Sequence, residues 1–83
     1  GNPSIMATRG KILLQLDRVD ESLALLENAF NTSANSPDIG IDYVVALLKA
    51  KNDSEAREVL TQLNPKTQEH ERRINELKVQ TNL

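Results

Sequence analysis

The chain contains an internal repeat, and this feature constrains its fold more than any other. When the sequence is slid along itself until Pro3 falls on Pro37, a displacement that we call the repeat shift, many other positions coincide. Aliphatic, acidic and small residues match in this one register: Ile5 with Ile39, Leu13 with Leu47, Leu14 with Leu48, Glu21 with Glu55, Ser22 with Ala56 and Leu26 with Leu60. The register therefore aligns helix starts, apolar positions and turns together, which indicates stacked copies of one supersecondary unit.

Each unit is predicted to contain two helices. Asn2-Pro3 and Ser36-Pro37 each place an N-cap residue before a proline at the first helical position. Apolar residues then recur at helical spacing, and Asn52 with Glu55 has the form of a capping box. The chain lacks the alternation and turn dipeptides of β-hairpins. The predicted fold class is all-α, with about five antiparallel helices covering roughly 4–16, 19–30, 37–50, 52–63 and 67–81.

A repeat of two helices with this period resembles the tetratricopeptide repeat, whose unit is about 34 residues long. The family's motif positions hold Met6, Gly10, Leu13, Ser22, Leu26 and Ala29 in the first copy, and Gly40, Val44, Leu47, Ala56, Leu60 and Leu63 in the second. The chain departs from the family in lacking the signature aromatics and the closing proline. The resemblance implies a right-handed solenoid with repeats at 2–35 and 36–64, followed by a capping half-repeat at 65–83. The charges of that half-repeat, including Glu71-Arg72-Arg73, are interpreted as a solvated face.

Small residues carry most of this resemblance. Gly10, Ser22, Ala29 and Ala56 occupy positions where the family needs two helix backbones to approach closely. Ser22 stands at the head of a row of leucines, and its small size explains its place there. We therefore expect alanine to be tolerated at Ser22 and leucine to overpack the helix crossing.

Composition and motifs argue against several functions. The net charge is −2, which gives no reason to expect nucleic acid or a membrane surface as a partner. The chain has no cysteine and a single histidine, His70, which we interpret as structural or solvated. No glycine-rich phosphate loop or nucleophile with an adjacent base is recognisable. We therefore predict no enzymatic activity, no cofactor and no metal, in a cytoplasmic protein.

The resemblance implies a function in protein–protein interaction. In the family the first helix of each repeat lines a concave groove, which here would offer Lys11, Leu14, Gln15, Ile41, Val45 and Lys49 to a protein or peptide. Ala7 and Asp42 stand where a carboxylate-binding clamp has lysine or asparagine, so such a clamp is not expected. A groove of aliphatics and a few charges suits a segment with apolar side chains. The alternative is that the aliphatics Leu14, Ile41 and Leu48 of this face simply pack against neighbouring helices.

A narrower resemblance links the run from Leu25 to Pro65 to the repeat region behind the thioredoxin domain of certain bacterial co-chaperones. It implies a fragment of a longer protein. A second reading is a structural or oligomerisation segment of a longer repeat array, with no ligand of its own. In that case the first helix exposes a face that a preceding repeat would cover, and the isolated chain could form homo-oligomers.

Overall fold

The computed structural model describes residues 2–82, and in this range it contains five helices and no strand. The helices are α1 (Pro3–Gln15), α2 (Val19–Thr32), α3 (Pro37–Lys49), α4 (Asp53–Gln62) and α5 (Gln68–Gln80). The all-α prediction is confirmed. No helix in the described range is long and apolar enough to cross a membrane.

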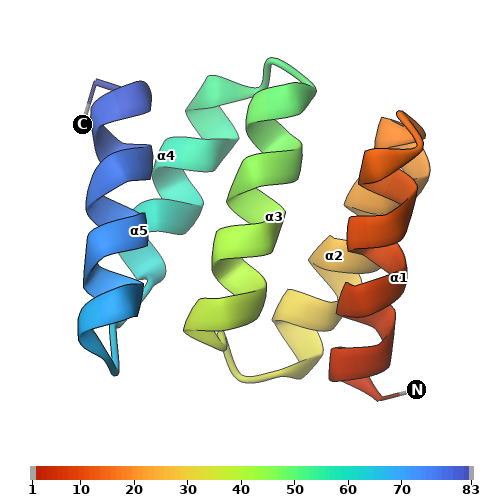
Figure 1. Cartoon of the computed structure of the whole chain (residues 1–83), viewed down its shortest axis with the longest axis horizontal. Coiled ribbons are helices and arrows are strands. Elements are labelled where there is room, and N and C mark those ends of the chain that lie inside the picture. Colours follow the sequence, from red (N-terminus) through yellow and green to blue (C-terminus); the bar gives the residue numbers. More distant parts are fainter. Residues whose placement is uncertain (1, 83) are drawn as a thin grey trace.

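The helices form two layers (Figure 1). Helices α1, α3 and α5 lie side by side in the front layer, while α2 and α4 lie behind them. Helix α3 is central, because it packs against α1, α2, α4 and α5. Its sequence fits this position, since its buried residues cover a wide face and leave only the side of Asp38, Asp42, Val45 and Lys49 open. The buried residues are Pro37, Ile39, Gly40, Ile41, Tyr43, Val44, Ala46 and Leu47.

The turn after the first helix of each pair recurs in the second pair. Asp17 and Lys51, which coincide at the repeat shift, both adopt left-handed backbone conformations, with φ of 63° and 61°. After α1, Arg18 N donates to Leu13 O at 2.9 Å, and after α3 the equivalent bond from Asn52 N also measures 2.9 Å. Each turn thus closes its helix with the wide hydrogen bond of a Schellman motif. The periodicity of the sequence is therefore also a periodicity of backbone structure.

Helix starts are capped by side chains at three of the five helices. Asn2 Oδ1 accepts from Ser4 N at 2.8 Å, Asn52 Oδ1 accepts from Glu55 N at 3.4 Å, and Thr67 Oγ1 accepts from His70 N at 3.1 Å. The N-cap predicted at Ser36 is wrong in one respect, because its side chain makes no capping bond. Its backbone N–H instead donates to Ser33 Oγ at 3.2 Å.

The crossing of α1 and α2 is built on small residues. Ser22 is fully buried, and its hydroxyl donates to the backbone oxygen of Gly10 at 2.6 Å. A Cβ atom at Gly10 would lie 2.7 Å from Cγ of Leu26, which is itself fully buried. The remaining residues of the predicted repeat signature, Ala29, Leu47, Ala56 and Leu60, are also buried, and Leu13 is half-buried. Close backbone approach is therefore a real requirement at this crossing.

Substitutions at Ser22 test this packing. Ser22→Leu is expected to lower the free energy of unfolding by about 1–3 kcal/mol, because the added carbons have no space in the crossing. The hydrogen bond to Gly10 changes our expectation for Ser22→Ala, which should cost about 0.5–1.5 kcal/mol rather than nothing. Urea unfolding measures both. Ala24→Leu, at an exposed position of the same helix, is the control. If Ser22→Leu left the free energy of unfolding unchanged, the proposed alignment of the two repeats would be wrong.

Candidate functional site

The front layer carries a groove formed by two adjoining hollows. The larger has a volume of about 300 Å³ and lies between α3 and α5, lined by Val45, Leu48, Lys49, Leu77 and Gln80. The smaller, of about 180 Å³, lies where α1, α3 and α5 face one another, lined by Lys11, Leu14, Gln15, Asp42, Val45 and Arg73. Val45 lines both hollows, so they adjoin at this residue, and we call the two together the groove.

Five of the six residues predicted to line a concave surface do line the groove: Lys11, Leu14, Gln15, Val45 and Lys49. Binding through them remains a prediction. The prediction for Ile41 is wrong, because this side chain is only 1% exposed. The residue one repeat earlier, Ala7, is buried as well, at 5%. Since α1 packs against α3 and α3 against α5, this position belongs to the core and offers no surface to a partner.

The groove also contains residues that the sequence reasoning does not place there. These are Arg73 in the smaller hollow and Leu77 and Gln80 in the larger one. Asp42, which the sequence places on this face at a clamp position, lines the smaller hollow as well. Arg73 is exposed, as expected of a solvated face, but it borders the hollow as well. The position of Arg73 could have been predicted from the spacing of the N-cap residues. Thr67, the N-cap of α5, follows Ser36, the N-cap of α3, by less than one repeat shift. Aligning α5 to α3 by those caps places Arg73 level with Asp42.

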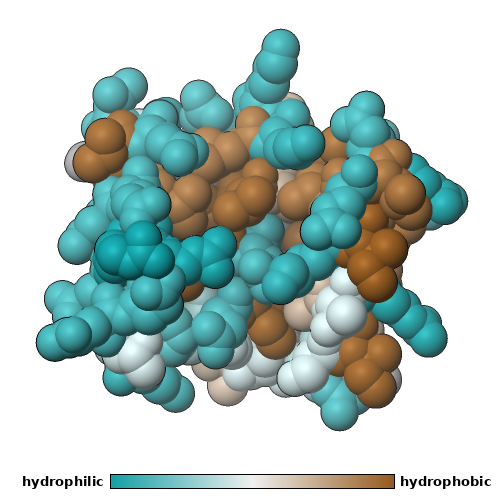
Figure 2. Space-filling view, viewed as in Figure 1, coloured by the Kyte–Doolittle hydropathy of each residue, from teal (hydrophilic) through white to brown (hydrophobic). Residues whose placement is uncertain are grey.

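Aliphatic side chains form the floor of the groove, and charged groups border it. Leu14, Val45 and Leu48 are partly buried and pack against the core while keeping some exposed surface. These residues therefore contribute both to the core and to the lining of the groove, while binding of a partner through them stays a prediction. Figure 2 shows hydrophobic surface on the front face, with hydrophilic side chains around it. This combination of an apolar floor and a polar border is typical of recognition surfaces.

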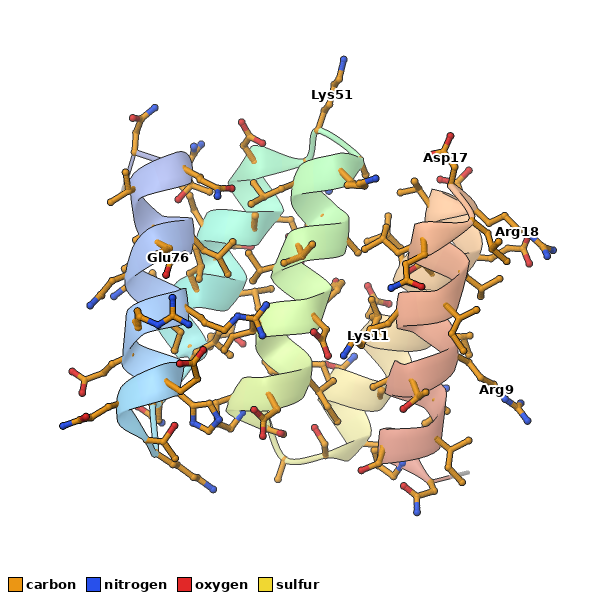
Figure 3. All side chains as sticks on the ribbon, viewed as in Figure 1. Arg9, Lys11, Asp17, Arg18, Lys51 and Glu76 are labelled. Carbon is orange, nitrogen blue, oxygen red and sulfur yellow. The ribbon has the colours of Figure 1, made fainter. Side chains whose placement is uncertain are left out.

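The charges of the groove centre on Asp42. Lys11 projects from α1 toward α3 (Figure 3), and Arg73 lines the same hollow from α5. Burial raises the pKa of Asp42, while the positive charges of Lys11 and Arg73 oppose this rise and the carboxylate of Asp38 adds to it. Because burial outweighs the two cations, keeping Asp42 ionised costs the folded protein free energy at neutral pH. With Lys49, the groove has three cationic side chains and one carboxylate.

One polar side chain outside the groove, that of His70, links two helices. His70 is half-buried, and its Nδ1 accepts from Lys66 N at 3.2 Å, so the neutral ring carries its proton on Nε2. That Nε2 lies 2.7 Å from Asp38 Oδ1 and joins α5 to α3. The structural interpretation of His70 is confirmed. In the described part of the chain, no group of three or more histidine, cysteine or acidic side chains could hold a metal ion.

The raised pKa of Asp42 gives a pH-dependent prediction. The folded state binds the proton of Asp42 more tightly than the unfolded state does. The loss of stability caused by ionised Asp42 is therefore complete above the pKa of the folded state, and it disappears as the pH falls toward the ordinary pKa of 3.8. Asp42→Asn should therefore raise the thermal midpoint at pH 7, and its advantage should shrink as the pH falls toward 4. Thermal unfolding followed by circular dichroism across this range measures both effects. A variant less stable than the parent at pH 7 would contradict this assignment.

Comparison with known proteins adds one match. A family model described as tetratricopeptide repeat matches residues 1–80, nearly the whole chain. No curated protein and no solved structure matches the chain.

Proposed function

Because the chain belongs to the tetratricopeptide repeat family, whose repeats generally mediate protein–protein interaction, we propose that its groove binds an extended or helical segment of a partner protein. The proposed segment lies across α1, α3 and α5 and places apolar side chains in the two hollows. The division into repeats at 2–35 and 36–64 with a half-repeat at 65–83 belongs to the same proposal.

The observation that carries this proposal is that the two hollows adjoin at Val45, which lines both. A single valine at the junction lets one ligand bury neighbouring side chains on both sides of it. The energetic contribution of such a surface is concentrated in a few central apolar contacts. Val45, Leu14 and Leu48 are the central residues here, and they already rest on a packed core, so binding orders few side chains.

The charged border supports a preference among ligands. Lys11, Lys49 and Arg73 outnumber the single carboxylate of Asp42 along the groove. Segments that carry an acidic residue beside their apolar side chains should bind better than basic ones, because complementary charges fix the register and speed association. Asp42 supports a role of this surface in recognition, though not the preference for acidic segments, since a carboxylate kept ionised at a cost to stability is more useful for recognition than for folding.

Selection of peptides from a displayed random library on the immobilised chain tests the proposal. The selected peptides should share aliphatic or aromatic residues, and Val45→Arg should reduce their binding at least tenfold by filling the junction of the hollows. Val79→Arg is the matched control, because Val79 is 76% exposed on α5 and does not line the groove. If the peptides still bound Val45→Arg but no longer bound Val79→Arg, the groove would not be the binding site.

A second variant keeps this test decisive if Val45→Arg unfolds. Lys11 is exposed on α1, so Lys11→Glu should leave the helical circular dichroism signal unchanged. It should weaken acidic peptides more than neutral ones, since it reverses a charge beside the smaller hollow. Equal effects on both peptide classes would count against the proposed charge preference.

A structural or oligomerisation segment remains the second candidate, and one observation favours it. Helix α1 exposes two large aliphatic side chains, Ile5 and Ile12, and its C-cap residue Leu16 exposes a third. Sedimentation of the chain over a range of concentrations separates the candidates, because a segment that serves only to assemble copies should dimerise and select no peptide. Membership of a thioredoxin-like co-chaperone and a cytoplasmic location remain predictions.

A further inference from the structure

Three charged side chains line the smaller hollow, one from each helix of the front layer. Lys11 comes from α1, Asp42 from α3 and Arg73 from α5. Lys11 and Arg73 are exposed, whereas Asp42 is half-buried. Because α3 lies between α1 and α5 (Figure 1), the carboxylate of the hollow has a cation on either side of it.

The carboxylate of Asp42 is not paired with either cation. Within residues 2–82 the ion pairs involve four other acidic residues, Glu21, Asp38, Glu69 and Glu76. Lys11 and Arg73 therefore act on Asp42 from beyond ion-pair distance, and their charges lower its pKa by less than burial raises it. The hollow, with its volume of about 180 Å³, leaves room for a further polar group beside this carboxylate.

The repeat itself does not require an acid at this position. The repeat shift places Thr8 on Asp42. Thr8 is exposed, and its hydroxyl serves its own helix by donating to the backbone oxygen of Ser4 at 2.9 Å. Because the first repeat folds with a threonine here, the carboxylate of Asp42 is a property of the groove and not of the repeat.

A ligand group that enters the smaller hollow meets both signs of charge. It needs a donor for Asp42 and an acceptor for Lys11 or Arg73. A carboxylate would meet the like charge of Asp42, and an ammonium or guanidinium group would meet two cations. A side-chain carboxamide, as in asparagine or glutamine, carries a donor and an acceptor on one planar group without net charge. It is therefore the group that fits all three charges.

A side chain suits this hollow better than the backbone of the ligand. In a helical segment the backbone groups are already bonded within the helix. In an extended segment, a backbone group would have to leave the apolar floor formed by Leu14 and Val45 to reach Asp42. A carboxamide side chain reaches the hollow from either conformation.

From these observations we infer that Asp42 determines the specificity of the groove by selecting a segment with asparagine or glutamine at the position that enters the smaller hollow. The carboxamide N–H donates to Asp42, in a charge-assisted hydrogen bond, and the carboxamide oxygen accepts from Lys11 or Arg73. This inference rests on the proposed function, because it names the ligand chemistry of the same groove.

The remaining contacts of the segment follow from the lining of the groove. The apolar side chain next to the carboxamide rests on Val45, where the two hollows adjoin. Beyond it, Lys49 is the one charged side chain among the described residues that line the larger hollow. An acidic residue of the segment therefore meets a cation and no carboxylate there.

Two parallel selections from one displayed random peptide library test this inference, one on the parent chain and one on Asp42→Asn. Peptides selected by the parent should share asparagine or glutamine at one fixed position beside an apolar residue. Asp42→Asn removes the negative charge and leaves both cations, so its peptides should carry aspartate or glutamate at that position. The variant should fold, because it removes a carboxylate whose ionisation burial disfavours.

The matched control is Asp20→Asn, which removes an exposed carboxylate of α2 that does not line the groove. It makes the same change in net charge as Asp42→Asn and should select the same peptides as the parent chain. This control separates the local effect of Asp42 from the effect of total charge.

A pair of synthetic peptides measures the size of the effect. One is the consensus peptide from the parent selection, and the other has its carboxamide residue replaced by the acid of the same length. In fluorescence anisotropy at pH 7, the parent chain should bind the carboxamide peptide at least about tenfold more tightly, because the acid would face Asp42. Asp42→Asn should reverse this order.

Failure of this inference is distinguishable from failure of the proposed function. The carboxamide inference alone is overturned if Val45→Arg abolishes binding but the peptides carry an acidic residue, a basic residue or no preferred residue at that position. It is also overturned if Asp42→Asn keeps the order of the two peptides. If the library yields no peptide, or if the peptides bind Val45→Arg as tightly as the parent, the proposed function fails and this inference fails with it.

Discussion

Where α1 crosses α2, the helices are close enough for the hydroxyl of Ser22 to reach the backbone oxygen of Gly10 at 2.6 Å. This approach requires a residue without a side chain at Gly10, because Leu26 occupies the space in which a Cβ atom would lie. The crossing fixes the first helix pair. Since α3 packs against both α1 and α2, that pair in turn positions α3, whose Val45 joins the two hollows of the groove. A larger residue at Gly10 or Ser22 would therefore shift α3 and change the groove.

The two repeats divide side-chain volume differently. Gly10 corresponds to Val44, while Met6 corresponds to Gly40 and Ala29 to Leu63. In the second repeat Gly40 is the small residue, and a Cβ there would collide with Leu63 and approach Phe30. In the first repeat the larger residue is Met6 and the smaller is Ala29. The backbone period is thus retained while large and small residues exchange between helices, in keeping with the tolerance of cores for rearrangement that conserves volume. This exchange shows that equivalent positions of the two repeats can differ in size while the backbone repeats.

Most of the fold could be predicted from the sequence, because the repeat register carries helix starts, turns and small residues together. Asp17 and Lys51 are recognisable as turn positions for this reason. The site is less predictable. Ile41 has the repeat position of a groove residue, but its exposure depends on how α5 docks against α3, which is a tertiary contact. Arg73 escapes prediction because α5 follows α3 by less than one repeat shift, N-cap to N-cap, and so leaves the register. Local sequence patterns predict where the helices begin and end. Which residues line a surface between helices depends on how those helices pack against one another.

The most direct test of the central claim is a double-mutant cycle at Gly10 and Leu26. Gly10→Ala should destabilise the chain even though alanine is favoured in helices by about 1 kcal/mol, because its methyl group meets the fully buried Leu26. Leu26→Ala removes that obstacle while costing about 2–5 kcal/mol by itself. If close approach at Gly10 governs the crossing, urea unfolding should show the double variant more stable than the sum of the single effects predicts, by at least about 1 kcal/mol. Strictly additive losses would show that the two helices do not meet as described.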